Sequence, residues 1–211
     1  MNAPTPIRPA AKRNLRSFWM RQFQTWHWIS AAISLAAMLL FSITGITLNH
    51  ASTISAEPVV TQRTGQLPAP LVRRLTGNGS EPLSPAVADA VENAIGLDAI
   101  GRAAEWSDGE VYVALPRPGG DAWVSIDRTT GAIEAEVTDR GWIAWANDLH
   151  KGRNSGAAWF WFIDLFAVAC VVFTITGLLL LQMHARRRPS TWPIVIAGLV
   201  LPAVLAIFFI H

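Results

Sequence analysis

Three long apolar stretches separate membrane-like parts of the chain from a polar part. The stretches cover residues 28–48, 157–181 and 192–210. A helix needs about 20 apolar residues to cross the hydrocarbon core of a bilayer, so each stretch is long enough. We therefore predict three transmembrane helices. With their polar ends included, these helices cover residues 26–50, 150–184 and 192–211.

The region between the first two stretches, residues 51–149, has the pattern of a small folded domain. Its first part, 51–83, is rich in Pro, Gly, Ser and Thr and predicts irregular structure. Ser84 and Pro85 then suit the N-cap and the first position of a helix that ends at Gly96. Alternating apolar and polar residues predict strands at 110–115, 122–126 and 132–137. The predicted fold is an α-helical membrane protein with a small α+β domain between transmembrane helices 1 and 2.

Charge is sorted between these parts. The 51–149 domain holds fourteen of the fifteen acids against seven arginines, and the rest of the chain holds ten basic residues and one acid, Asp164. Only 15% of the residues are charged and 51% are apolar, against about 25% charged in a typical soluble domain. These values exclude a soluble globule and a disordered chain. Cys170 is the only cysteine, which excludes a disulfide framework and a thiolate zinc site.

Basic residues near the span ends predict the orientation, because Lys and Arg favour the cytoplasmic side. Five of them precede the first span in a cytoplasmic segment, 1–25, and three follow the second span in a cytoplasmic loop, 185–191. They are Arg8, Lys12, Arg13, Arg16, Arg21, Arg186, Arg187 and Arg188. We therefore expect a cytoplasmic N-terminus, an external 51–149 domain and an external C-terminus.

All five histidines lie at the ends of apolar stretches. His27 and His184 fall at the cytoplasmic level, and His50 and His150 fall at the external level. The helix from His27 to His50 is about 34 Å long, close to the ~30 Å thickness of the hydrocarbon core. Two imidazoles at each level suit one bis-histidine haem per level, an arrangement that favours electron transfer. His211 has no partner at its position and is not expected to be a ligand.

Two simpler interpretations of these residues stay open. An interfacial histidine can lie at headgroup level without any ligand. The segment 41–45, Phe-Ser-Ile-Thr-Gly, recurs as Phe-Thr-Ile-Thr-Gly at 173–177, and each copy is followed within two turns by a histidine. Gly45 and Gly177 would let a porphyrin approach the backbone, although close helix–helix packing is the favoured reading of the glycines alone.

Asp164 is the only acid predicted inside the hydrocarbon. An ionisable residue at this depth is expected to have a function. It either accepts a hydrogen bond from a ligand histidine and so raises its basicity, or pairs with Lys151 or Arg153 and anchors the helix.

Several segments together resemble the PepSY-associated transmembrane-helix proteins of bacterial inner membranes. The matching segments are Asp148-Leu149-His150-Lys151-Gly152, residues 159–164, Thr176-Gly177, and Thr44-Gly45 followed by Asn49-His50. The likeness covers roughly residues 20–188, and the 51–149 domain resembles the PepSY domain of this family.

The resemblance implies a function as well as a fold. Members of the family include haem b-containing ferric reductases, and a three-span chain of this size resembles the dihaem members. It implies two haems per chain, with His27 and His184 as cytoplasmic ligands and His50 and His150 as periplasmic ligands. Electrons would pass across the inner membrane to ferric iron or a ferric siderophore for iron acquisition.

The expected partners follow from this hypothesis. No dinucleotide-binding fingerprint is present, so the cytoplasmic electron donor is a reduced flavin, a flavin reductase or a quinol. A homodimer in the lipid bilayer is plausible, and no nucleic-acid partner is expected. The alternatives are a non-catalytic, membrane-anchored PepSY module that binds a peptide or restrains a peptidase, and a cytochrome b subunit of a quinone-linked enzyme or a haem carrier.

Overall fold

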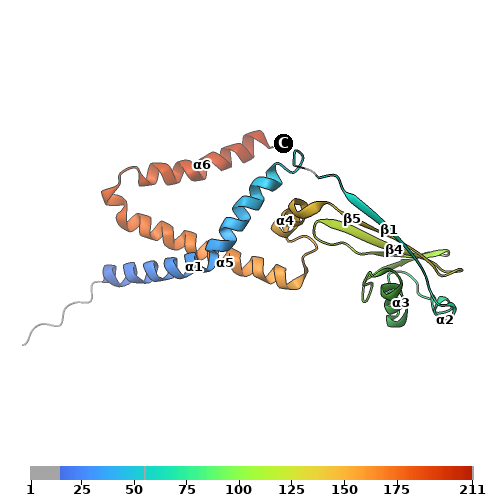
Figure 1. Cartoon of the computed structure of the whole chain (residues 1–211). Helices are drawn as coiled ribbons and strands as arrows, with labels where there is room; N and C mark the ends of the chain where they lie inside the picture. The colour runs from blue at the N-terminus through green and yellow to red at the C-terminus, as the bar shows by residue number, and fades with distance from the viewer. Residues whose placement is uncertain (1–14, 55, 211) are drawn as a thin grey trace, which may run out of the picture. The chain divides into compact units, whose positions relative to one another are not determined.

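The computed structural model describes residues 15–54 and 56–210 (Figure 1). The chain forms two compact units, which are described separately. One unit contains the chain up to Ala37 together with Asp164 onward, and the other contains Met38–Ile163. Arg8, Lys12 and Arg13, which supported the predicted orientation, and His211 lie outside the described residues.

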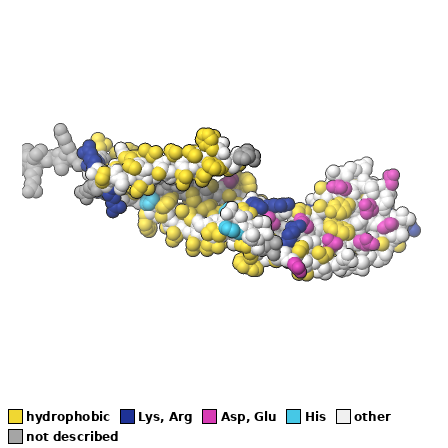
Figure 2. Space-filling model, turned by 90° about the horizontal axis from the view of Figure 1, so that it is seen from above, with side chains coloured by type: hydrophobic (Ala, Val, Ile, Leu, Met, Phe, Trp, Pro, Cys, Tyr) yellow, Lys and Arg dark blue, Asp and Glu magenta, His cyan; other side chains and the backbone are white. Residues whose placement is uncertain are grey.

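Three helices are long and apolar enough to cross a membrane, which confirms that prediction. They are α1 (Leu15–Asn49), α5 (Gly156–His184) and α6 (Thr191–Phe209). Most of their large apolar side chains are exposed. Figure 2 shows hydrophobic side chains over the helices and acidic side chains over the sheet domain. Apolar surface of this extent indicates a membrane-embedded protein.

The second span begins later than predicted. Residues Gly141–Lys151 form a separate helix, α4, and α5 begins at Gly156, not at residue 150. Gly152 ends α4 with a φ of 66°, a left-handed conformation that glycine adopts without a steric penalty. His150 therefore lies in the last turn of α4 and not on the second span. The first helix is also longer than the predicted 26–50, because α1 starts at Leu15.

The polar domain contains a five-stranded antiparallel sheet in the order β1-β5-β4-β3-β2. Its strands are β1 (Val59–Gln66), β2 (Ala104–Trp106), β3 (Glu110–Ala114), β4 (Gly120–Asp127) and β5 (Ala132–Asp139). In chain order these strands follow α1 and precede α4 and α5. The three predicted strands are confirmed as β3, β4 and β5, with small changes at their ends.

The prediction of irregular structure over 51–83 is wrong in its middle. Val59–Gln66 pairs with β5 along its whole length, and the short helix α2 (Ala69–Val72) follows. The sequence of β1, Val-Val-Thr-Gln-Arg-Thr-Gly-Gln, does not alternate, and the strand is mostly exposed. Because β1 is an edge strand, backbone hydrogen bonds to β5 define it more than burial does.

The predicted helix of the polar domain is confirmed as α3 (Pro85–Ile95). Pro85 occupies the first turn, Ser84 stands at the N-cap without a side-chain cap bond, and Gly96 ends the helix with a φ of 68°. Its buried face, Val87, Ala88, Val91 and Ile95, joins the apolar residues of the sheet in one core. The domain is therefore the predicted α+β unit.

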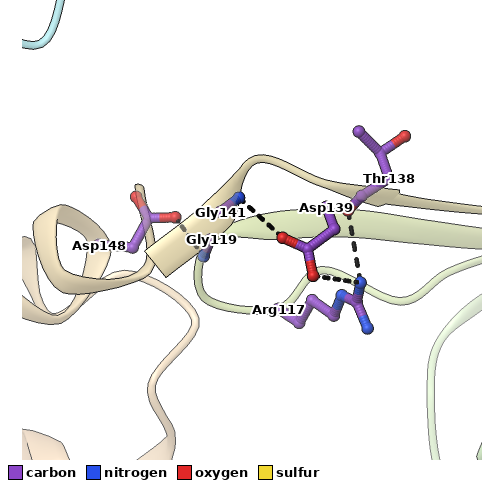
Figure 3. A network of polar contacts seen from close by, with 6 residues as sticks. All are labelled: Arg117, Gly119, Thr138, Asp139, Gly141 and Asp148. Atoms are coloured by element: carbon purple, nitrogen blue, oxygen red, sulfur yellow. Dashed lines mark hydrogen bonds and ion pairs between the residues drawn. The ribbon is translucent and has the colours of Figure 1, made fainter. Parts of the chain in front are cut away.

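Polar contacts fix α4 to the end of the sheet (Figure 3). A carboxylate oxygen of Asp148 accepts the backbone N–H of Gly119 at 2.9 Å. Asp139 accepts the N–H of Gly141 at 2.7 Å and lies 3.9 Å from the Arg117 guanidinium. Since Asp148 is two residues before His150, these contacts also set the position of that histidine.

Candidate functional site

His27 lies against the second copy of the repeated motif. Its Nδ1 is 3.1 Å from the carbonyl oxygen of Phe173 and 3.2 Å from Oγ1 of Thr176. The imidazole stacks on the Phe173 ring, with centroids 4.4 Å apart and planes inclined by 16°. A Cβ at Gly177 would lie only 3.3 Å from Cε1 of His27. We call these four residues the His27 site.

The contacts of the His27 site determine the tautomer of the ring. A carbonyl oxygen only accepts, so Nδ1 of His27 must carry the proton. The Thr176 hydroxyl donates to the Val172 carbonyl at 2.7 Å, which leaves its oxygen as a second acceptor for the same N–H. In the neutral ring, Nε2 then keeps a lone pair, and no hydrogen-bond partner for it is seen within residues 15–54 and 56–210. This is the tautomer that binds a metal through Nε2.

His184 shares a cavity with His27. Its Nδ1 donates to the Leu180 carbonyl of its own helix at 2.8 Å, so its Nε2 is also the nitrogen with a lone pair. The cavity has a volume of about 710 Å³. Its lining residues are His27, Phe173, Thr174, Gly177, Leu178, Leu180, Leu181, His184, Arg188 and Thr191. The structure therefore brings the first predicted histidine pair to one cavity.

His150 lies against the first copy of the motif. Its Nδ1 is 2.8 Å from Oγ1 of Thr44, and its ring centroid is 5.0 Å from that of Phe41. A Cβ at Gly45 would lie 3.5 Å from Cε1 of His150. The Thr44 hydroxyl donates to the Leu40 carbonyl at 2.8 Å, so its oxygen accepts the Nδ1–H of His150. We call these four residues the His150 site.

His50 is not part of the pocket beside His150. Its ring is exposed, and Nδ1 donates to the Ile46 carbonyl of its own helix at 3.0 Å. The pocket beside His150 has a volume of about 160 Å³. It is lined by Leu40, Phe41, Thr44, Trp145, Ala146, Leu149, His150 and Trp159. The second predicted pair therefore does not share a pocket.

The two pockets differ in their fit to a haem. Cofactor sites typically measure about 300–1,000 Å³, and the 710 Å³ cavity at His27 lies in that range with two histidines on its wall. The 160 Å³ pocket at His150 lies below it. Among the described residues, no group of three or more His, Cys, Asp or Glu side chains is placed to hold a metal ion. The His27 site thus fits a bis-histidine haem, and the His150 site does not fit one.

Asp164 makes neither of the contacts expected of it. Its side chain is exposed on α5, and within the described part of the chain it takes part in no hydrogen bond or ion pair. Each predicted glycine, by contrast, lies against an imidazole, Gly45 against His150 and Gly177 against His27. The glycines therefore allow a histidine ring to approach the backbone of a neighbouring helix.

The two copies of the repeated motif contact histidines other than the ones that follow them in the chain. His50 follows Gly45 and His184 follows Gly177, whereas the motif copies contact His150 and His27. His50 comes five residues after Gly45, which places it about 140° around the axis of an α-helix. The two residues therefore face different sides of the helix and cannot both contact the same neighbouring helix. Thr44, Thr176, Phe41 and Phe173 were not predicted as contacts of the histidines, although their repetition was the available signal.

Comparison with known proteins identifies the family of the chain and gives no match to an individual protein. No curated protein and no solved structure gives a significant match to the chain. One family model, described as "Putative PepSY_TM-like", matches residues 18–211, which include the sheet domain, the second and third candidate spans and all but the first three residues of the first. The chain therefore belongs to this PepSY_TM-like family.

Proposed function

We propose that the protein conducts electrons across the bacterial inner membrane through b-type haem and reduces ferric iron or a ferric siderophore at the periplasmic face. The observation that carries this proposal is the cavity of about 710 Å³ that His27 and His184 line. Both rings engage Nδ1 with an acceptor and leave Nε2 with a lone pair. A bis-histidine haem would supply one-electron redox chemistry without an open iron position.

The residues of this cavity have separate roles in the proposal. His27 and His184 would hold the haem iron, and Gly177 leaves room for the His27 ring. Arg188 lies on the same cavity wall, where a guanidinium suits a carboxylate substituent of a cofactor. The apolar remainder, including Leu178 and Leu181, excludes water from the ring. The site therefore combines metal ligands, a cation and an apolar wall.

The orientation predicted from the basic residues would let electrons reach this cavity from the cytoplasm. Arg16, Arg21 and Arg186 lie near the same ends of α1 and α5 as His27 and His184, and Arg16 donates to the Met183 carbonyl at 3.3 Å. A cytoplasmic N-terminus and a periplasmic sheet domain follow from the positive-inside rule. The electron donor is a separate molecule: a reduced flavin, a flavin reductase or a quinol.

The second predicted haem, between His50 and His150, is not carried into the proposal. His150 has the ligand tautomer, but His50 does not line its pocket, which is small. The proposal therefore assigns one haem to each chain, at His27 and His184. A second redox carrier outside this site must then take the electron from the cytoplasmic level across the ~30 Å hydrocarbon core to the periplasmic face.

The test is the haem content and activity of the purified full chain. We expect a b-type spectrum with at least one haem per chain by pyridine haemochrome. Liposomes that contain the protein and an internal reductant should reduce an external ferric chelate. His27→Ala and His184→Ala should remove the haem and the activity, and His211→Ala is the matched control that keeps both.

Two other outcomes would redirect the interpretation. A colourless protein whose histidine variants are unchanged in fold would contradict the proposal and leave a membrane-anchored PepSY module. A haem protein that turns over quinol but no ferric chelate would indicate a cytochrome b subunit of a partner enzyme.

A further inference from the structure

The two copies of the Phe-x-Ile-Thr-Gly motif make the same set of contacts to two different histidines. In each copy the phenylalanine lies against the imidazole, the threonine Oγ1 lies within 3.2 Å of Nδ1, and the glycine faces Cε1. α1 carries both His27 and the motif copy that contacts His150 of α4, and α5 carries the motif copy that contacts His27. The recurrence of all three contacts is not explained by general helix packing.

The threonine is the part of the motif with a defined chemical effect. Both Thr44 and Thr176 donate their hydroxyl proton to the carbonyl four residues earlier, at 2.8 and 2.7 Å. Each threonine oxygen can therefore only accept a hydrogen bond from the neighbouring imidazole. Among the two neutral tautomers, only the one with its proton on Nδ1 can donate that bond. A side chain that fixes this tautomer both orients the ring and raises the basicity of Nε2.

Thr174 is a neighbouring threonine that makes the same bond to its own helix but does not contact a histidine. Thr174, two residues before Thr176, donates its hydroxyl to the Cys170 carbonyl at 2.8 Å in the same way. It is exposed, and no contact to a histidine involves it in the described part of the chain. The hydroxyl–carbonyl bond is thus common to this helix, whereas the acceptor contact to an imidazole belongs to Thr176.

We propose that Thr44 and Thr176 are positioning residues that hold His150 and His27 as Nδ1–H tautomers, and that at His27 this tautomer presents Nε2 for metal ligation. The ligation part rests on the proposed function, and the tautomer part does not. At His150 the proposal concerns the tautomer alone, because its pocket of about 160 Å³ does not fit a haem. Each copy of the Phe-x-Ile-Thr-Gly motif then positions a histidine of another helix, and not the histidine that follows the motif in the chain.

The two threonines differ in how much they contribute. Nδ1 of His27 has a second acceptor, the Phe173 carbonyl at 3.1 Å. For His150, the Thr44 hydroxyl is the one acceptor seen among the described residues. Removal of Thr44 should therefore change the tautomer of its histidine more than removal of Thr176 does.

The direct test is nitrogen NMR of the imidazoles in the full chain, produced without haem and held in lipid nanodiscs. With ¹⁵N-labelled histidine, the five rings give separate tautomer signals, and His27→Ala and His150→Ala assign two of them. We expect both rings to be Nδ1–H in the wild type. Thr44→Val should produce a clear Nε2–H signal from His150, and Thr176→Val a weaker one from His27.

Matched variants separate positioning from folding. Thr174→Val and Ser42→Ala change the same motif copies and should leave both tautomers as in the wild type. Thr176→Ser retains a hydroxyl and should keep His27 as Nδ1–H. The tautomer claim is overturned if either ring is Nε2–H in the wild type, or if Thr44→Val leaves His150 unchanged.

A second measurement addresses ligation in haem-loaded protein. A less basic ligand stabilises ferric iron less, so Thr176→Val should raise the midpoint potential and weaken haem binding, by about tenfold if it acts like other outer-shell partners. Ser42→Ala, which alters the other copy of the motif at a residue outside this cavity wall, should change neither. An unchanged potential in Thr176→Val contradicts the ligation claim, whereas absence of haem from every variant contradicts the proposed function and leaves the tautomer result standing.

Discussion

The His27 site and the His150 site each place a phenylalanine, a threonine and a glycine around an imidazole, yet the spaces beside the two rings differ in size. The first opens on a cavity of about 710 Å³ that carries a second histidine, and the second on a pocket of about 160 Å³ that carries none. Holding a histidine in a ligand tautomer is therefore one property, and providing room and a second ligand is another. In this chain both properties meet at His27 and only the first is present at His150.

The difference follows from what surrounds each ring. Around His27 the cavity wall is made by leucines and by residues near the end of α5, up to Thr191 at the start of α6. Around His150 the wall includes Trp145 and Trp159, whose indoles occupy the space. The Trp159 N–H also donates to the Leu149 carbonyl at 2.8 Å, so this ring is fixed beside His150.

The largest expected effect is at the ligands themselves. His27→Ala or His184→Ala should lower haem affinity by more than the roughly 10–100-fold loss that follows removal of an outer-shell partner. His50→Ala should leave the haem of the His27 site in place, because His50 does not line that cavity. Haem-to-protein ratios measured after detergent extraction check this, and equal loss in His27→Ala and His50→Ala would contradict the comparison.

A smaller but graded effect is expected at the two glycines. A Cβ at Gly177 would lie 3.3 Å from the His27 ring, closer than ordinary contact, and one at Gly45 would lie 3.5 Å from the His150 ring. Gly177→Ala should therefore displace His27 by a few tenths of an ångström and broaden the haem spectrum, whereas Gly45→Ala should be tolerated. Gly198→Ala, with open space around it, is the control.

The position of His150 should depend on an anchor that His27 lacks. Asp148→Ala removes the carboxylate that accepts the Gly119 N–H, and we expect it to lower the free energy of unfolding of the Met38–Ile163 unit by about 1–2 kcal/mol. The ¹⁵N signal of His150 should broaden as α4 loosens, while that of His27 should stay sharp. If both signals changed together, the two sites would not be independent.

The smallest effect is a pH dependence in the sheet domain. Asp127 accepts the backbone N–H groups of Thr130 and Thr129 in the turn between β4 and β5, and these bonds lower its pKa from the usual 3.8. Its stabilising contribution is thus present above pH 3.8 and is lost as the pH falls through the lowered pKa. Asp127→Asn should melt slightly below the wild type at pH 7.

That stability difference should close in strong acid. Melting curves of both proteins by circular dichroism measure it, and a gap that widens toward low pH would contradict the assignment. Neither histidine site should respond, because Asp127 lies on the sheet and touches neither.

Sequence reasoning predicted the features that follow from regular patterns. The three spans follow from apolar length, α3 from Ser84, Pro85 and Gly96, and strands β3 to β5 from alternation. β1 was not predicted, because an exposed edge strand has no alternation to detect. The separation of α4 from α5 was not predicted either, because the residues on both sides of the Gly152 turn continue a helical pattern.

The site could be predicted only in part for a similar reason. Composition and depth along the helices singled out His27, His184, His50 and His150, since those are properties of single positions. Which histidine a motif contacts depends on how two helices are rotated against each other, and neither composition nor depth contains that angle. The pairing of Thr44 with His150 and of Thr176 with His27 required the structure.

The central claim is the proposal that His27 and His184 would together hold one haem in the cavity that both line. The most direct measurement is the low-temperature electron paramagnetic resonance spectrum of the oxidised full chain. The account predicts a low-spin ferric signal of a bis-imidazole haem that persists in His50→Ala and becomes high-spin or disappears in His184→Ala. A low-spin signal that survives in His184→Ala, or that is absent from the wild type, would contradict it.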